Sequence, residues 1–293
     1  MGPGAERRIT RRALLKYGLR LSALGVCGMG FEARNNLRIE RVRLPFPNLP
    51  PAFRGFRIVQ ISDLHASFWV TQDYLAEVVR QINRLPSDLV VITGDFLTGA
   101  VNRFWKRWLP FSPKDYTAVL AGVLSHLEPG DKIAVLGNHD QGNGGNNEQC
   151  LVDELERIGI RVLRNESLTL RRGDHRICLA GTDDFWFSYD LSKTLRGVPE
   201  GRFKILLSHN PDASGDITPE MRVDLTLCGH THGGQVVVPF LTRFILPINS
   251  SLKYMAGLVR EPYGYTYVNR GIGTLVFPFR ISAPPEITHF TLI

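Results

Sequence analysis

Cysteine is scarce in this chain, and the spacing of the few present excludes two kinds of scaffold. The 293 residues hold four cysteines, Cys27, Cys150, Cys178 and Cys228, and no two of them form a Cys-x-x-Cys pair. A zinc finger needs such pairs, and a disulfide-rich domain needs a dense cysteine framework. We therefore expect a core built from apolar side chains, with Cys228 as a small buried member of it.

The apolar run near the N-terminus is too short to cross a bilayer comfortably. Residues 21–31 fall short of the roughly 20 apolar residues that a spanning helix needs. The run follows Arg11 and Arg12, and this pair with the Leu-Leu-Lys after it resembles a twin-arginine export signal. We predict that residues 1–33 are such a signal or a membrane anchor, the alternative being an amphipathic basic helix lying on a membrane. The predicted location is the bacterial periplasm or cell envelope, with anchoring to the inner membrane if the leader is retained.

The folded body has no excess of positive charge, which excludes a broad nucleic-acid footprint. The net charge is +7, but residues 1–30 contribute +5 and residues 31–60 a further +4, which leaves −2 for the rest. Proteins that bind the phosphate backbone carry basic residues across the folded surface. We predict no specific nucleic-acid partner. Residues 34–54, which hold four prolines, are expected to form a strand and a Pro-rich connector.

Five apolar segments that each end in a polar cluster indicate an α/β fold. They cover residues 56–61, 88–93, 132–136, 203–207 and 225–228, and helix-period segments (72–83, 116–127 and 148–158) lie between most of them. Because α/β folds place ligands at the C-terminal ends of strands, we expect the polar clusters to form a site there.

The polar clusters hold most of the histidines of the chain. They are Asp63 with His65, Gly94-Asp95, Gly137-Asn138-His139-Asp140, Ser208-His209-Asn210-Pro211 and Gly229-His230-Thr231-His232. Imidazole and carboxylate are typical ligands of divalent cations. There are structural alternatives: Asp63 and His65 would cap the following helix, and His230 and His232 would bond to backbone and water. The other three histidines, His126, His175 and His289, are interpreted as structural.

In this order, the five clusters resemble the signature blocks of the calcineurin-like metallophosphoesterases. The resemblance runs from about residue 55 to the end and implies one catalytic domain over residues 55–293. The implied fold is α/β, a sandwich of two mixed sheets flanked by helices in four layers. The implied cofactors are two divalent metal ions, for which mixed nitrogen and oxygen ligands favour Mn, Fe or Zn. One ion would be held by Asp63, His65, Asp95 and His232, and the other by Asp95, Asn138, His209 and His230.

The implied reaction is hydrolysis of a phosphodiester or pyrophosphate by a metal-bridging hydroxide. His139 would assist the leaving group as a general acid. Asp140 would either orient His139 or cap a helix. The chain also resembles a bacterial exported or membrane-associated phosphodiesterase subfamily, some of whose relatives hydrolyse UDP-2,3-diacylglucosamine. A pyrophosphatase of lipid A biosynthesis is therefore one alternative, and a non-catalytic metal-binding scaffold is a second, which the complete ligand set disfavours.

Four further segments bear on the substrate, which we expect to be a small phosphodiester or pyrophosphate. Residues 101–113 interleave aromatic and basic side chains, which suits contact with a membrane surface or a lipid-linked substrate, or alternatively a lid packed on the core. Residues 239–255 form a similar apolar and basic stretch. Residues 142–147 are expected to form a mobile loop over the metals. Asp183 and Asp184, followed by Phe185-Trp186-Phe187, are interpreted as a surface turn, the alternative being a loop that contacts the substrate.

Overall fold

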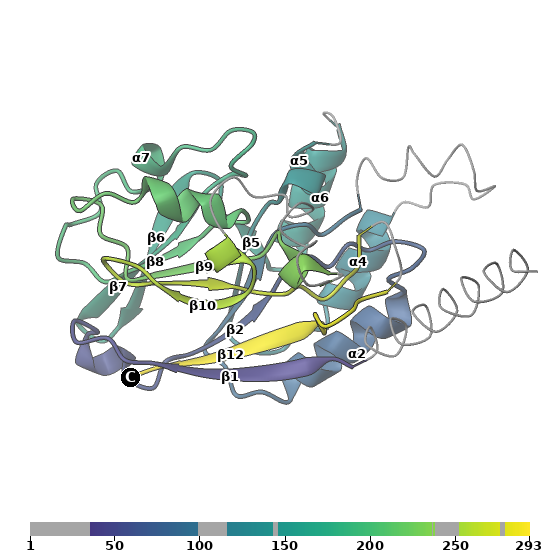
Figure 1. Cartoon of the computed structure of the whole chain (residues 1–293), viewed down its shortest axis with the longest axis horizontal. Helices are drawn as coiled ribbons and strands as arrows, with labels where there is room; N and C mark the ends of the chain where they lie inside the picture. The colour runs from purple at the N-terminus through teal and green to yellow at the C-terminus, as the bar shows by residue number, and fades with distance from the viewer. Residues whose placement is uncertain (1–35, 99–115, 143–145, 236, 238–251, 276–278) are drawn as a thin grey trace, which may run out of the picture.

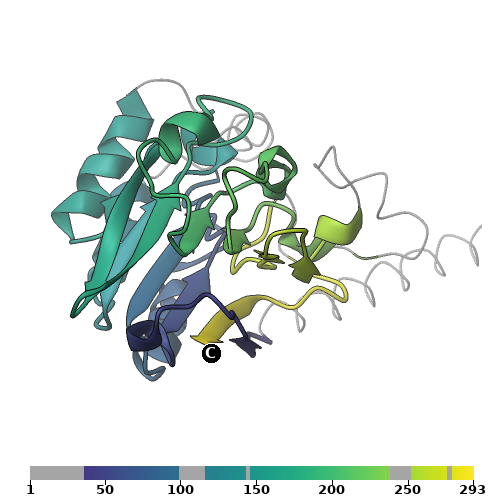
Figure 2. The same ribbon diagram turned by 90° about the vertical axis from the view of Figure 1, so that its left-hand side faces the viewer.

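Two six-stranded mixed sheets form the centre of the fold (Figures 1 and 2). The computed structural model describes residues 36–98, 116–142, 146–235, 237, 252–275 and 279–293. The first sheet has the order β1 (Arg38–Leu44), β12 (Glu286–Leu292), β2 (Arg57–Ile61), β3 (Leu89–Thr93), β4 (Asp131–Val135) and β5 (Arg161–Val162). The second has the order β10 (Gly257–Arg260), β11 (Tyr265–Val268), β9 (Leu225–Cys228), β8 (Lys204–Leu207), β7 (His175–Gly181) and β6 (Glu166–Arg172).

The central strands are continuous apolar runs because both of their faces are covered. In β3, Val90 and Ile92 belong to the core under the helices, whereas Leu89 and Val91 belong to the core between the two sheets. The inter-sheet core also contains Ile205 of β8 and Leu227 of β9. Strand alternation therefore divides one apolar segment between two cores.

Three helices cover the outer face of the first sheet (Figure 1): α2 (Gln72–Asn83), α4 (Tyr116–Leu124) and α6 (Asn146–Arg157). Helix α2 buries Leu75, Val78, Val79 and Ile82, which form one stripe at helical spacing. Its N-cap is Thr71, whose side chain accepts a hydrogen bond from Tyr74 N. The alternative that Asp63 and His65 cap this helix is therefore wrong.

The outer face of the second sheet packs against α7 (Leu191–Thr194) and the segment after it. Leu191 and Leu195 contact Cys178, Ala180 and Leu206 there. The layers are therefore helices, sheet, sheet and a thinner helical cover, which confirms the four-layer α/β sandwich. Cys228 is fully buried, as expected. The remaining short elements are η1 (Pro51–Phe53), α5 (Asn138–Gln141), η2 (Pro211–Asp216), η3 (His232–Gly234) and η5 (Leu252–Tyr254).

The predicted N-terminal strand is part of the first sheet, since β1 pairs in parallel with β12 over its whole length. Strands β2 to β5 run parallel to one another, as do β7, β8, β9 and β11. Among the described residues, no helix combines the length and apolar character that crossing a bilayer requires. The predictions made for residues 1–33, 101–113, 143–145 and 239–251 lie outside the described part of the chain.

Candidate metal centre

The predicted ligands lie in tight loops at the C-terminal ends of β2, β3, β4, β8 and β9. Nine non-glycine residues of the described chain have positive φ, and five of them are predicted ligands: Asp63, His65, Asp95, His230 and His232. Residues other than glycine rarely adopt this conformation, and where they do, the strain tends to mark a functional site. The loops therefore hold these side chains at a cost in local backbone energy that the surrounding fold must offset.

The first donor group contains Asp63, His65 and His232, all buried, whose ligand atoms lie within 4.8 Å of one another. Nε2 of His65 is 3.0 Å from Nε2 of His232, and the two rings stack at 4.9 Å. Nε2 of His232 is 3.4 Å from Oδ1 of Asp63. Two imidazole nitrogens and a carboxylate oxygen that converge in this way suit a divalent cation.

The second donor group contains Asp95, His209 and His230, again buried and within 4.8 Å. Nε2 of His209 lies 3.2 Å from Oδ2 of Asp95, 3.1 Å from Nδ1 of His230 and 3.2 Å from Oδ1 of Asn138. The same Asp95 oxygen is 3.4 Å from Nε2 of His65 in the first group. Asp95 thus lies between the two groups, and the structure brings all seven predicted ligands together.

The tautomer of His209 follows from its partners. Nδ1 of His209 lies 2.7 Å from the carbonyl oxygen of Thr93, the last residue of β3. A carbonyl only accepts, so Nδ1 carries the hydrogen and, in the neutral ring, Nε2 presents its lone pair to the site.

The charges in the site favour a cation. Burial lowers the pKa of His65 to about 3 and lowers that of His232 well below its ordinary value. Burial also raises the pKa of Asp63 to about 6. Burial opposes protonation of His209, but the charges of Asp95 and Asp63 outweigh it and raise the pKa of His209 well above its usual range. The centre therefore stabilises positive charge beside Asp95, as a metal site must.

His139 is half-buried at the rim of the centre, in the one-turn helix α5. Its ring lies 5.1 Å from the ring of His65, and its backbone N–H donates to Oδ1 of Asp95 at 2.9 Å. The carboxylate of Asp140 accepts hydrogen bonds from the backbone of Phe96, Leu97 and Gly137. Asp140 therefore caps α5 and links the loop after β3 to the loop after β4. Of the two roles predicted for it, these contacts are those of the helix cap.

A second layer of residues holds the ligand loops in place. Gly273 N donates to the carbonyl of Asp63 at 2.7 Å, and Ile272 N donates to that of Ser62.

Arg280 is fully buried and supports the loop that carries His232. Its guanidinium donates to the carbonyl of His232, and its Nη2 lies 3.3 Å from Nδ1 of the same residue. It also donates to the carbonyls of Arg270, Gly273 and Ala283. The sequence did not predict this role of Arg280, because a single arginine in a loop carries no signal of burial.

The interpretation of Asp183 and Asp184 as a surface turn is wrong. Both are buried, because Arg164 and Asn165 bond to the carboxylate of Asp183 and because Asp184 N donates to Oε1 of Gln141, beside the metal centre. Trp186 and Phe187 after them are exposed. Trp186 packs its ring edge to face on His230, at 4.8 Å and 81°.

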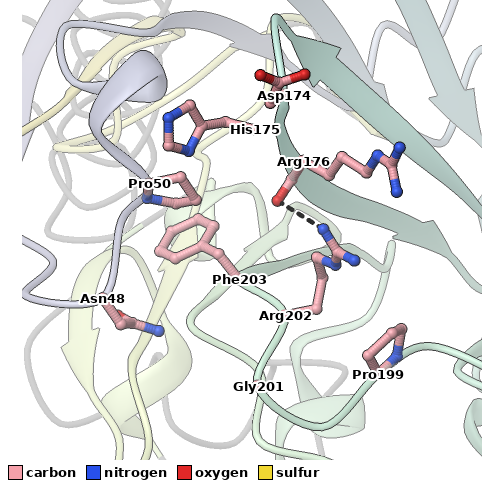
Figure 3. A pocket seen from close by; sticks show the side chains of 9 residues that line it. All are labelled: Asn48, Pro50, Asp174, His175, Arg176, Pro199, Gly201, Arg202 and Phe203. Atoms are coloured by element: carbon pink, nitrogen blue, oxygen red, sulfur yellow. Dashed lines mark hydrogen bonds between the residues drawn. The ribbon is translucent and has the colours of Figure 1, made fainter.

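A separate pocket of about 330 Å³ lies at the end of the second sheet that is opposite to the predicted ligands (Figure 3). It lies at the N-terminal ends of β7 and β8, lined by His175, Arg176, Arg202 and Phe203 among others, and Arg202 donates to the carbonyl of Arg176. The predicted ligands of this sheet follow the C-terminal ends of β8 and β9, so this pocket is not part of the metal centre.

Residues 56–234 match the protein-family model described as calcineurin-like phosphoesterase. The chain is 36% identical over 246 residues to the uncharacterized metallophosphoesterase YkuE of Bacillus subtilis (strain 168), covering 83% of this chain and 81% of that protein. It is 30% identical over 239 residues to phosphodiesterase YaeI of Escherichia coli (strain K12), covering 81% of this chain and 82% of that protein. It is also 30% identical over 266 residues to an uncharacterized metallophosphoesterase of Aquifex aeolicus (strain VF5), covering 87% of this chain and 92% of that protein.

Proposed function

The chain belongs to the calcineurin-like phosphoesterase family, and we propose that it hydrolyses a phosphodiester or a pyrophosphate with two divalent metal ions. The membership confirms the family resemblance of the five clusters and makes the chain a phosphoester hydrolase. The observation that carries the proposal is the position of Asp95. One of its oxygens lies 3.4 Å from His65 and 3.2 Å from His209, so a single carboxylate serves both donor groups.

The proposed ligands of one ion are Asp63, His65, Asp95 and His232, and those of the other are Asp95, Asn138, His209 and His230. The donor set fits Mn, Fe or Zn, because imidazole nitrogens accompany the oxygens in both groups. When bound, such ions supply positive charge to the phosphoryl oxygens and lower the pKa of water enough to give a nucleophile at neutral pH. The protein holds their ligands in fixed tautomers and rotamers, as the bond from His209 to Thr93 illustrates.

We assign the leaving-group proton to His139. Its ring stands at the edge of the first donor group, and its backbone is fixed by the bond to Asp95. Unlike the ligand histidines, it is half-buried and accessible to a substrate. An imidazolium there would protonate the departing oxygen, a contribution of about 100- to 10,000-fold in rate.

The substrate and the location are supported by the sequence alone. The leader-like residues 1–33 and the aromatic and basic residues 101–113 support an envelope location with a membrane-associated or lipid-linked substrate. The alternative, UDP-2,3-diacylglucosamine as substrate, is supported by the same aromatic and basic segment. An exported destination opposes this alternative, since that nucleotide-linked substrate is made in the cytoplasm.

The test is hydrolysis by metal-stripped protein reloaded with Mn, with bis(p-nitrophenyl) phosphate and UDP-2,3-diacylglucosamine as parallel substrates. We expect metal-dependent turnover of the generic diester, abolished in Asp95→Ala and reduced in His139→Ala. His126→Ala, which changes a histidine of the turn after α4, is the matched control and should keep full activity. Turnover of the lipid nucleotide alone would favour the pyrophosphatase, and no metal-dependent turnover of either would refute the enzyme assignment.

A further inference from the structure

Two exposed aromatic side chains stand beside the metal centre. Trp186 is 45% exposed although its ring packs on His230 of the second donor group. Phe187 is 50% exposed, and its ring lies over Gly142, where an added Cβ would be 3.2 Å from Phe187 Cζ. Gly142 directly follows α5, which carries His139. Trp186 therefore contacts a proposed metal ligand, and Phe187 lies over the residue that follows the helix carrying the proposed acid.

The loop that carries them, which we name the aromatic loop (residues 183–188), connects β7 to α7 (Figure 1) and is firmly anchored. Asp184 is fully buried; its backbone N–H donates to Gln141 at 2.7 Å, and its carboxylate accepts from Trp186 N at 3.0 Å. At the two ends of the loop, Asn165 bonds to Asp183 and to the carbonyl of Ser188.

The anchoring gives the exposed rings a fixed place. A single exposed aromatic residue on a protein surface needs no explanation. Here two consecutive aromatic residues, Trp186 and Phe187, lie beside the metal centre, and the buried carboxylate of Asp184 fixes the backbone of Trp186. Ligand sites typically combine such apolar surface with a few convergent polar groups. Because the edge-to-face contact with His230 covers only part of the indole, a large part of Trp186 is left for a ligand.

We propose that Trp186 and Phe187 form an aromatic platform that binds a planar aromatic ring on the substrate, such as a nucleobase or an aryl group. The proposal rests on the proposed function and specifies its substrate class. Half-exposed aromatic rings suit stacking against a ring, whereas an acyl chain is bound by enclosing apolar walls. The platform thus selects esters by the group that the phosphoryl carries, while the metal centre acts on the phosphoryl itself.

The test compares three p-nitrophenyl phosphodiesters whose second ester group is thymidyl, phenyl or methyl, so that the same bond breaks in each. In Trp186→Ala we expect KM to rise about 10-fold for the thymidyl and phenyl esters and less than about 2-fold for the methyl ester, with kcat little changed. Trp186→Phe, which keeps a ring, should retain most of the preference. A rise for one aromatic ester only would identify which ring the platform accepts.

Each ester also carries the p-nitrophenyl ring, so an equal change for all three overturns the proposal when phenylphosphonate binding is unchanged, because Trp186 would then have a structural role. An equal change together with weaker phenylphosphonate binding would support the platform, with the p-nitrophenyl ring on it. Metal content is measured for every variant, since Trp186 contacts a proposed ligand. Phe187→Ala, whose ring packs on Gly142, is the second variant, and it should show the same selectivity change at wild-type metal content.

A binding measurement separates this proposal from the proposed function. Phenylphosphonate and methylphosphonate are not hydrolysed, so calorimetry gives their affinities even if no ester is turned over. We expect phenylphosphonate to bind about 10-fold more weakly to Trp186→Ala than to the wild type, with methylphosphonate unchanged. Equal phenylphosphonate affinity for the two proteins would overturn the platform, whatever the outcome for hydrolysis.

Discussion

The close approach of Gly137 to Asp95 makes Gly137→Ala a sharp probe of the metal centre. Gly137 has φ −105° and ψ 177°, an extended conformation that alanine adopts without strain. An added Cβ would lie 2.6 Å from Asp95 N and 2.8 Å from Asp95 Cγ, and closer still to Oδ1. Since ordinary contacts begin near 3.4 Å, N and Cγ of Asp95 must move by about 0.6–0.8 Å and Oδ1 by more.

Such a shift displaces the carboxylate that both donor groups share. We expect kcat/KM to fall about 100-fold, the cost of misplacing a reacting group by about 1 Å. Metal affinity should fall by about 10- to 100-fold, as when the support of a ligand is lost. The assays are hydrolysis of bis(p-nitrophenyl) phosphate and metal content after gel filtration.

The matched control is Gly122→Ala in α4, where an added Cβ meets no atom within 4 Å. It should keep full activity and gain about 0.5–1 kcal/mol of stability from its helical position. The reasoning would be refuted if Gly137→Ala held as much metal as the wild type and stayed within about 3-fold of its activity.

Two further predictions concern stability. The neutral state of His65 contributes stability above pH 6.5, and this is lost as the pH falls toward its folded pKa of about 3, by about 1.4 kcal/mol per pH unit. Urea unfolding of the metal-free protein between pH 6 and 4 should therefore show a shallower pH dependence for His65→Gln, and equal slopes would contradict the assignment. Arg280→Met should cost about 2–4 kcal/mol of unfolding free energy, because it leaves buried carbonyls without donors. Arg80→Met, at an exposed pair with Glu77, should change stability little, and similar losses in the two variants would count against the role of Arg280.

The strands that bear the proposed ligands were predictable from the sequence because each is an apolar run that ends at a glycine or a polar cluster. The predicted helix over residues 72–83 coincides with α2, since its apolar stripe and the cap at Thr71 act locally. The predicted helix over 116–127 ends earlier, at Leu124, and His126 lies in the turn after it. Spacing alone did not predict that Asp63 lies beside His232, 169 positions later. The order of the clusters and their family resemblance led to that prediction.

The residues that the sequence analysis missed owe their positions to contacts between distant segments. Asp184 follows β7 in a pattern that any turn would show, and only the bond to Gln141, 43 positions earlier, makes it part of the centre. Arg280 is placed by carbonyls of the Arg270 and Gly273 segment and of η3. Local propensity contains no information about such partners, so these residues required the tertiary structure.

The central claim is that Asp95 lies between two metal sites, and anomalous diffraction from crystals grown with Mn tests it most directly. The account predicts two anomalous peaks about 3.5–4 Å apart, one against Asp63, His65 and His232 and the other against His209 and His230, with Asp95 contacting both. A single peak, or peaks away from these residues, would contradict it.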